Sequence, residues 1–155
     1  MKNKAYLVVP VLLLILALAV LSAGCTTPVE PPGNPETASS SAVEIVEIYH
    51  FHLTQQCYSC KTLGAYAEET VNTYFAPEVA SGKVIFAHVN IDLPENKELV
   101  EQYGPAGSSL FIGVYDKDGF HKEENVNVWY KIGNKEEYMA YLKGVIEKRL
   151  AGDLS

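Results

Sequence analysis

Beyond residue 42 the sequence alternates between short apolar runs and longer amphipathic stretches, and this order constrains the fold more than any other feature. The runs "VEIVEIYHF" and "KVIFAHVNI" are rich in β-branched and aromatic residues, as buried strands are. The expected elements are a strand at 43–51, a helix at 58–75, a strand at 83–91, a shorter helix at 94–104, two strands within 109–132 joined at Asp118-Gly119, and a helix opened by a capping box from Asn134 to Glu137. The predicted order is therefore β, α, β, α, β, β, α.

The part of the chain that can bury a core is expected to span about residues 43–151. These roughly 110 residues are a normal length for one compact domain with one core. The sequence shows no internal repeat. We therefore expect a single α/β domain.

Two cysteines separated by two residues lie where the first expected strand ends and the first helix begins. At a helix N-terminus Cys57 faces unpaired backbone N–H groups and the positive end of the helix dipole, which favour its thiolate. Cys60, one turn along, is placed to attack a mixed disulfide on Cys57. The chain has three cysteines, and Cys25 is expected to carry a lipid, as argued from the N-terminus below. Cys57 and Cys60 can then pair only with each other. In an exported protein such a pair is expected to be oxidised unless a partner reduces it. An inert staple is less favoured, because a four-residue loop stabilises by only about 2 kcal/mol.

Metal binding is a further interpretation of the same cysteines. His50 and His52 share one side of the first strand, because alternate residues of a strand point the same way. With Cys57 and Cys60 they compose H-x-H-x4-C-x2-C, a ligand set that zinc or copper accepts. His88 lies on another expected element and suggests no specific role. The alternative function is thus a non-enzymatic metal-binding module.

The order of elements, with its cysteine pair, resembles the thioredoxin-like superfamily. The stretch "HVNIDLPENKELVEQYG" is similar to the family's third core strand and second helix, and "DKDG" to the turn of its terminal hairpin. The resemblance implies an α/β thioredoxin-like fold with a central mixed sheet of about four strands flanked by helices. It also implies a thiol-disulfide oxidoreductase in which Cys57 attacks and Cys60 resolves, with no cofactor. Its partner would be a protein disulfide or a neighbouring redox protein.

The surroundings of the first cysteine depart from the family pattern. The family usually carries a Trp-rich segment there, whereas this chain has Leu53-Thr54-Gln55-Gln56, so the surface that meets a partner differs. Many members place a buried, proton-moving Asp six residues before the first cysteine, where this chain has Phe51. His52 or Glu47 could take over that role.

The position of the family's cis-proline also differs. The family sets this proline opposite the cysteines, and the corresponding stretch "YGPAGSSLF" offers Ser109 there. Pro105 is four residues too early, and Ser108 is the alternative if the alignment shifts by one. A serine leaves a smaller, polar side chain and an unlocked backbone.

Residues 1–24 are expected to form a signal peptide. Lys2 and Lys4 precede a charge-free apolar run from residue 5 to residue 23. The run ends in Leu21-Ser22-Ala23-Gly24-Cys25, which resembles a lipoprotein lipobox and implies a lipid on Cys25. Because the run is longer than a usual signal core, an uncleaved membrane helix is the alternative.

Residues 25–42 are expected to form a lipid-anchored flexible linker, since "TTPVEPPGNPETASSSA" is rich in Pro and Ser and almost free of large apolar residues. Both readings of the N-terminus place the domain at the extracytoplasmic face of the cell membrane. Loss of Lys2 and Lys4 from the 12 Lys and Arg leaves 10 against 19 Asp and Glu, a net charge of −9. Such a surface repels nucleic acid and anionic headgroups, so the lipid or helix must provide the membrane attachment.

Overall fold

The structure is a computed structural model that describes residues 42–155. The expected signal peptide, the lipid site at Cys25 and the 25–42 linker up to residue 41 lie outside the described residues. Within residues 42–155 no helix is long and apolar enough to cross a membrane.

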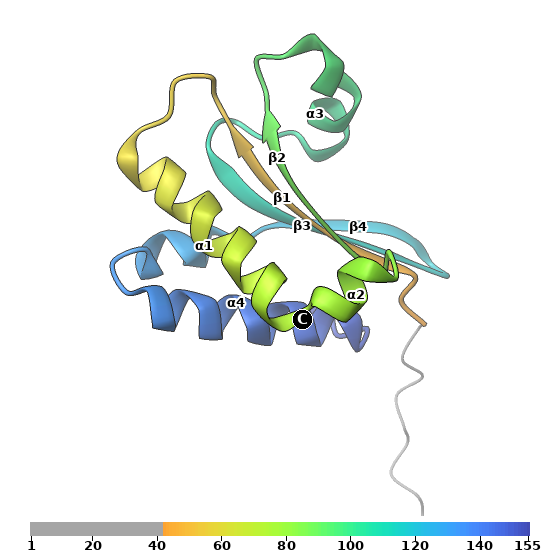
Figure 1. Cartoon of the computed structure of the whole chain (residues 1–155). Helices are drawn as coiled ribbons and strands as arrows, with labels where there is room; N and C mark the ends of the chain where they lie inside the picture. The colour runs from red at the N-terminus through yellow and green to blue at the C-terminus, as the bar shows by residue number, and fades with distance from the viewer. Residues whose placement is uncertain (1–41) are drawn as a thin grey trace, which may run out of the picture. The chain divides into compact units, whose positions relative to one another are not determined.

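The described chain contains four strands and four α-helices, with two short 3-10 segments between them (Figure 1). Their bounds are β1 Ile45–His52, α1 Tyr58–Tyr74, α2 Ala76–Ala80, β2 Val84–Asn90, η1 Pro94–Asn96, α3 Lys97–Tyr103, β3 Ser109–Asp116, β4 Gly119–Glu124, η2 Val126–Lys131 and α4 Lys135–Leu150. Each element expected from the sequence is present.

The four strands form one mixed sheet in the order β2-β1-β3-β4. β1 and β2 are parallel and joined through α1 and α2, whereas β3 pairs antiparallel with both β1 and β4. A parallel pair needs such a crossover, and a helix provides it. The expected α/β thioredoxin-like fold, with a four-stranded mixed sheet flanked by helices, is confirmed.

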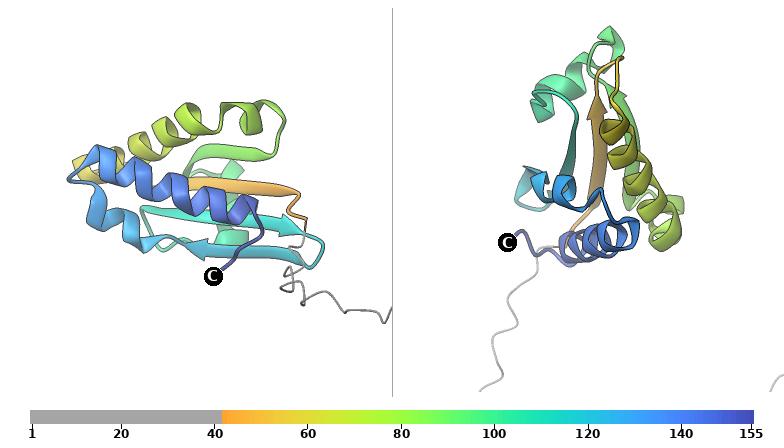
Figure 2. Two further views of the ribbon diagram at one scale, coloured as in Figure 1. Left: turned by 90° about the horizontal axis from the view of Figure 1, so that it is seen from below. Right: turned by 90° about the vertical axis from the view of Figure 1, so that its left-hand side faces the viewer.

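Helices cover both faces of the sheet (Figure 2). Buried apolar side chains form two cores, one on each face. Alternation along β1 sends Val46 and Ile48 into the core under α1 and α4, and Tyr49 and Phe51 into the core under α3. His50 belongs by parity to the α1 side and is buried there. The C-terminal end of β1, which carries His50 and His52, therefore leads to the start of α1.

Two segments differ from the expected elements. The helix α2 was not expected. It follows Phe75, whose side chain is buried in the core at the point where α1 ends. The second hairpin strand ends at Glu124, earlier than expected. There the N–H of Asn125 donates to the carbonyl of Leu110 (2.8 Å), and η2 then carries Val128 into the core below α4.

The predicted turn signals act as expected. Asp116 Oδ1 accepts from the backbone N–H groups of Asp118 and Gly119, which closes the β3–β4 hairpin. At the start of α4, Asn134 Oδ1 accepts from the N–H of Glu137 (3.0 Å), as an N-cap does. The Glu137 side chain pairs with Lys131 instead of returning to the cap, so only half of the capping box forms.

Candidate functional site

Cys57 and Cys60 form a disulfide across the first turn of α1. Cys57 is the N-cap residue, and the backbone N–H of Cys60 donates to its Sγ (3.2 Å). Its backbone carbonyl accepts from the N–H of Lys61 (3.1 Å). The sulfur therefore lies at the helix end, where unpaired donors and the helix dipole favour negative charge.

The two cysteines differ in exposure. Cys57 is exposed, whereas Cys60 is only partly accessible. The first turn of α1 carries no acidic residue that could compete with a thiolate for the helix end. The arrangement suits an exposed attacking thiol and a sheltered resolving thiol, the roles that the resemblance implied.

The loop before the disulfide is tied to the loop that follows β2. The N–H of Thr54 donates to Asp92 Oδ2 (2.8 Å), and Asn90 Nδ2 donates to Thr54 Oγ1 (3.0 Å). On these loops and at the helix start, Leu53, Leu93 and Tyr58 are 43%, 41% and 85% exposed. Exposed apolar side chains beside a redox pair give a polypeptide partner something to pack against.

His50 lies beneath α1, against the helix face that Cys60 shares with Gly64, four residues further on. His50 is 1% exposed, and a Cβ built on Gly64 would collide with its ring. The absence of a side chain at Gly64 makes room for the imidazole. Burial, then the nearby His88 and His52, lower the pKa of His50 to about 4, so the ring is neutral at pH 7.

His88 joins this site, although the sequence suggested no role for it. In the parallel pairing of β1 with β2, His88 stands beside His50, and their Nδ1 atoms are 2.9 Å apart. Its Nε2 lies 3.3 Å from Glu68 Oε2, on the exposed side of α1. Only the register of two strands distant in sequence brings the two histidines together, so no local pattern could have indicated it.

Of the residues expected to replace the family's buried Asp, Glu47 faces the other core. It accepts hydrogen bonds from the hydroxyls of Tyr103 (2.6 Å) and Tyr49 (3.1 Å) beneath α3. Burial, with Glu47 alongside, raises the pKa of both tyrosines, so both stay protonated donors. Phe51 also packs on that side. The hydrogen bonds of Glu47 thus serve the core under α3 and do not reach the disulfide.

His52 shares the side of His50, as the strand periodicity predicted, with ring centroids 5.3 Å apart. Its Nδ1 lies 2.9 Å from the carbonyl oxygen of Leu53, its own neighbour. Within residues 42–155 no group of three or more His, Cys, Asp or Glu side chains is arranged to hold a metal ion. The two histidines and the two cysteines therefore do not form a preassembled four-ligand centre.

Ser109 opens β3 and pairs with Phe51, the residue near the end of β1. It is buried, and its hydroxyl donates to the carbonyl of Gly107 (3.1 Å). The preceding Ser108, in the bend that leads into the strand, has a buried hydroxyl without a hydrogen-bond partner among residues 42–155. Both serines thus sit at the end of the sheet from which the loop to Cys57 departs.

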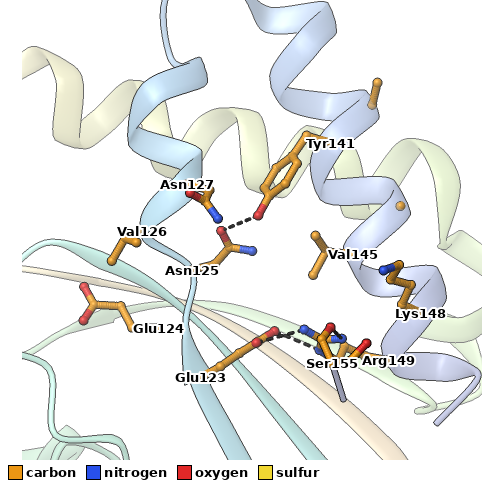
Figure 3. A pocket seen from close by; sticks show the side chains of 12 residues that line it. Glu123, Glu124, Asn125, Val126, Asn127, Tyr141, Val145, Lys148, Arg149 and Ser155 are labelled. Atoms are coloured by element: carbon orange, nitrogen blue, oxygen red, sulfur yellow. Dashed lines mark hydrogen bonds and ion pairs between the residues drawn. The ribbon is translucent and has the colours of Figure 1, made fainter. Parts of the chain in front are cut away.

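Two hollows flank α1 and α4. A cleft of about 370 Å³ beside the disulfide is lined by His50, His52, Gln56, Lys61, Ala65, Glu68 and His88. A larger hollow of about 570 Å³ lies between the end of β4 and α4 (Figure 3). Among the described residues no cysteine or histidine lines it, and its buried Arg149 already pairs through two nitrogens with Glu123. The chemistry of the site therefore belongs to the smaller cleft.

No protein-family model matches the sequence, and no curated protein matches it. Among solved structures, the chain is similar to the one described as "Crystal structure of Trx4 domain of ERdj5". The sequence identity is 15% and the TM-score 0.45, over 74% of this chain and 93% of that chain. The thioredoxin-like fold itself rests on the strand order and pairing that this chain shows directly.

Proposed function

We propose that this protein is a thiol-disulfide oxidoreductase acting on protein disulfides or on a redox partner protein. The observation that carries the proposal is the disulfide at the start of α1, with one exposed and one sheltered cysteine. A disulfide that spans four residues stabilises a fold weakly, so its placement at a helix end favours chemistry over stapling.

The reaction follows from this geometry. The Cys57 thiolate attacks one sulfur of a partner disulfide, forms a mixed disulfide and releases the other sulfur as a thiolate. Cys60 loses its proton and attacks Cys57, which forms the intramolecular disulfide and releases the second partner sulfur. Two electrons thereby pass from the cysteine pair to the partner, and the reverse sequence oxidises a partner dithiol.

We further propose that the domain works at the extracytoplasmic face of the membrane, held by a lipid on Cys25. The support is the apolar N-terminal run, the lipobox-like segment and the Pro-rich linker. A compartment in which disulfides persist suits the oxidised pair. Mass measurement of the native protein should show a chain that begins at lipid-modified Cys25. An intact N-terminus with Met1 would leave the uncleaved membrane helix.

The function is tested with the full chain in detergent, in a Cys25→Ser background that removes the third thiol. Reduced protein should accelerate reduction of a protein disulfide substrate. Cys57→Ser should abolish the activity, whereas Cys60→Ser should accumulate mixed disulfides. In the reduced protein, Cys57 should be alkylated at a pH well below the roughly 8.5 of a free thiol, with Cys60 lagging. Equal, slow alkylation of both cysteines would instead indicate an inert staple.

A further inference from the structure

A buried base on β1, His50, lies against α1 near the disulfide, and disulfide exchange between two cysteines does not by itself require it. His50 packs against Gly64, which follows Cys60 by four residues. Residues four apart on a helix lie on one face, with Cβ atoms roughly 5 to 6 Å apart. The imidazole therefore lies about one helical turn below Cys60.

Hydrogen bonding assigns the protons on the two linked histidines. Glu68 carries only acceptors when ionised, so the Nε2 of His88, 3.3 Å away, must hold a hydrogen. A neutral His88 then has a bare Nδ1, which accepts from the Nδ1–H of His50 across 2.9 Å. A neutral His50 in turn has a bare Nε2. That atom is buried and has no hydrogen-bond partner in the part of the chain that the structure describes.

We propose that His50, His88 and Glu68 form a proton relay that takes the proton of Cys60 when this thiol resolves a mixed disulfide. The proposal rests on the oxidoreductase function and adds a route for the proton. Three groups in hydrogen-bond or ion-pair contact lead from His50, packed one helical turn from Cys60, to the exposed side of α1. The route opens into the cleft that these residues line.

The Cys60 S–H proton moves, through one bridging water, to His50 Nε2 while the His50 Nδ1 proton moves to His88 Nδ1. His50 stays neutral, and His88 becomes an imidazolium beside the Glu68 carboxylate. The Cys60 thiolate attacks Cys57, the Cys57–partner bond breaks, and the partner leaves as a thiolate that solvent protonates. His88 then gives one proton to solvent through the cleft, and slower proton exchange with solvent returns both rings to their resting tautomers, with His50 protonated on Nδ1 and bare on Nε2.

Passing the proton onward matters because His50 is a poor place to leave it. Burial lowers the pKa of His50 to about 4, so a charge confined to this ring is disfavoured at pH 7. The His88 side chain is 39% exposed and faces a carboxylate, so charge there is solvated and paired. The other ionisable groups that line the cleft are His52 on β1 and Lys61 on α1. Within residues 42–155, neither His52 nor Lys61 forms a hydrogen bond with His88 or Glu68.

The experiment uses the full chain with Cys25→Ser, reduced, with EDTA present so that bound metal cannot occupy the histidines. Oxidised glutathione is the probe, and acid-quenched samples are analysed by mass for the Cys57–glutathione mixed disulfide. The variant is His88→Gln. Its matched control is His121→Gln on β4, because His121 Nε2 is also 3.3 Å from a carboxylate and its side chain is 41% exposed.

We expect His88→Gln to form the mixed disulfide at the wild-type rate but to resolve it about tenfold more slowly at pH 7. The difference should vanish at a pH where the Cys60 thiol ionises without help, and Glu68→Gln should show a smaller defect of the same kind. His121→Gln should match the wild type throughout. Resolution by His88→Gln at the wild-type rate across the whole pH range would overturn the relay.

A second measurement is independent of turnover. In the oxidised protein at pH 7, nitrogen-15 spectra of the imidazoles should show His50 protonated on Nδ1 and bare on Nε2. The opposite tautomer would contradict the relay. Glutathione reacts with any accessible thiol, so the relay is measurable even if no protein disulfide is turned over. Failure of catalysis on protein substrates would then refute the function alone.

Discussion

The two long helices begin with the same geometry but with different chemistry. In α4 the side chain of Asn134 accepts from the N–H three residues on, and in α1 the sulfur of Cys57 does the same. The first turn of α4 carries Glu136 and Glu137, whereas that of α1 carries no acid. Acids in a first turn stabilise a helix. The start of α4 is thus arranged for stability, and the start of α1 leaves the field of the helix end to a thiolate.

The glycine positions of the two helices differ in the same sense. Each has an interior glycine, and glycine costs up to about 1 kcal/mol relative to alanine. A Cβ on Gly144 of α4 would meet nothing within 4 Å, while one on Gly64 of α1 would strike His50. In α4, no close packing among the described residues requires a glycine at position 144. In α1 the same cost makes space for a buried base beside the cysteines.

The largest expected effect is that the buried His50 beneath α1 makes the stability of the protein depend on pH. An unfolded histidine titrates near pH 6.5, whereas burial, then His88 and His52, lower the pKa of His50 to about 4 in the folded protein. Between these values the unfolded chain binds more protons, so the free energy of unfolding falls as pH decreases from 6.5 to 4. The loss should approach about 3 kcal/mol, at about 1.36 kcal/mol per pKa unit.

Urea denaturation at pH 7 and pH 4.5 measures this, with His50→Leu as the comparison. Carboxylates contribute acid sensitivity to both proteins, so the difference between them isolates His50. His50→Leu should lose distinctly less stability between the two pH values than the wild type. Identical losses would show that His50 is not held neutral by its burial.

A smaller contrast is expected from filling the two glycines. Gly64→Ala should destabilise by about 1 to 3 kcal/mol, because overpacking against a buried ring outweighs the gain in helix propensity. Gly144→Ala should stabilise by about 0.5 to 1 kcal/mol, because the methyl group enters open space. Denaturation curves of both variants decide it. Two changes of the same sign would contradict the packing described for α1.

Local patterns in the sequence were sufficient for the elements, the hairpin at Asp118-Gly119, the cap at Asn134 and the placement of the cysteine pair at a helix start. Each of these depends on residues within about four positions of one another. The end of β4 and the helix α2 were missed, because burial of Val128 and Phe75 in the tertiary core decides where those segments turn.

The candidate base was missed for a related reason. Counting six residues back from Cys57 reaches Phe51, and the structure places that side chain under α3. The residue that points under α1 is its neighbour, His50, since a shift of one residue in a strand changes the face. The partner His88 depends on strand register across 38 residues, and the space at Gly64 depends on how α1 packs. None of these relations has a local signal.

The next contrast concerns the cap of α4. Asn134→Ala should cost about 1 kcal/mol, because the N–H of Glu137 loses its acceptor. The loss should be equal in the oxidised and reduced protein, since no redox group lies at that helix end. Asn134→Ser retains a capping oxygen and serves as the control. A loss that depends on redox state would mean that the two helix starts are coupled.

The smallest expected effect gives α1 the kind of start that α4 has. Ser59→Glu places a carboxylate in the first turn of α1, where it interacts favourably with the helix dipole and unfavourably with the Cys57 thiolate. The oxidised protein should therefore become a few tenths of a kcal/mol more stable, while alkylation of reduced Cys57 at pH 7 slows roughly two- to fivefold. Ser59→Gln separates charge from size, and added salt should shrink both effects by screening. If the carboxylate raised stability without slowing alkylation, the absence of acids from this turn would have no bearing on the thiolate. Opposite signs would show that the helix start gives up stability to keep Cys57 reactive.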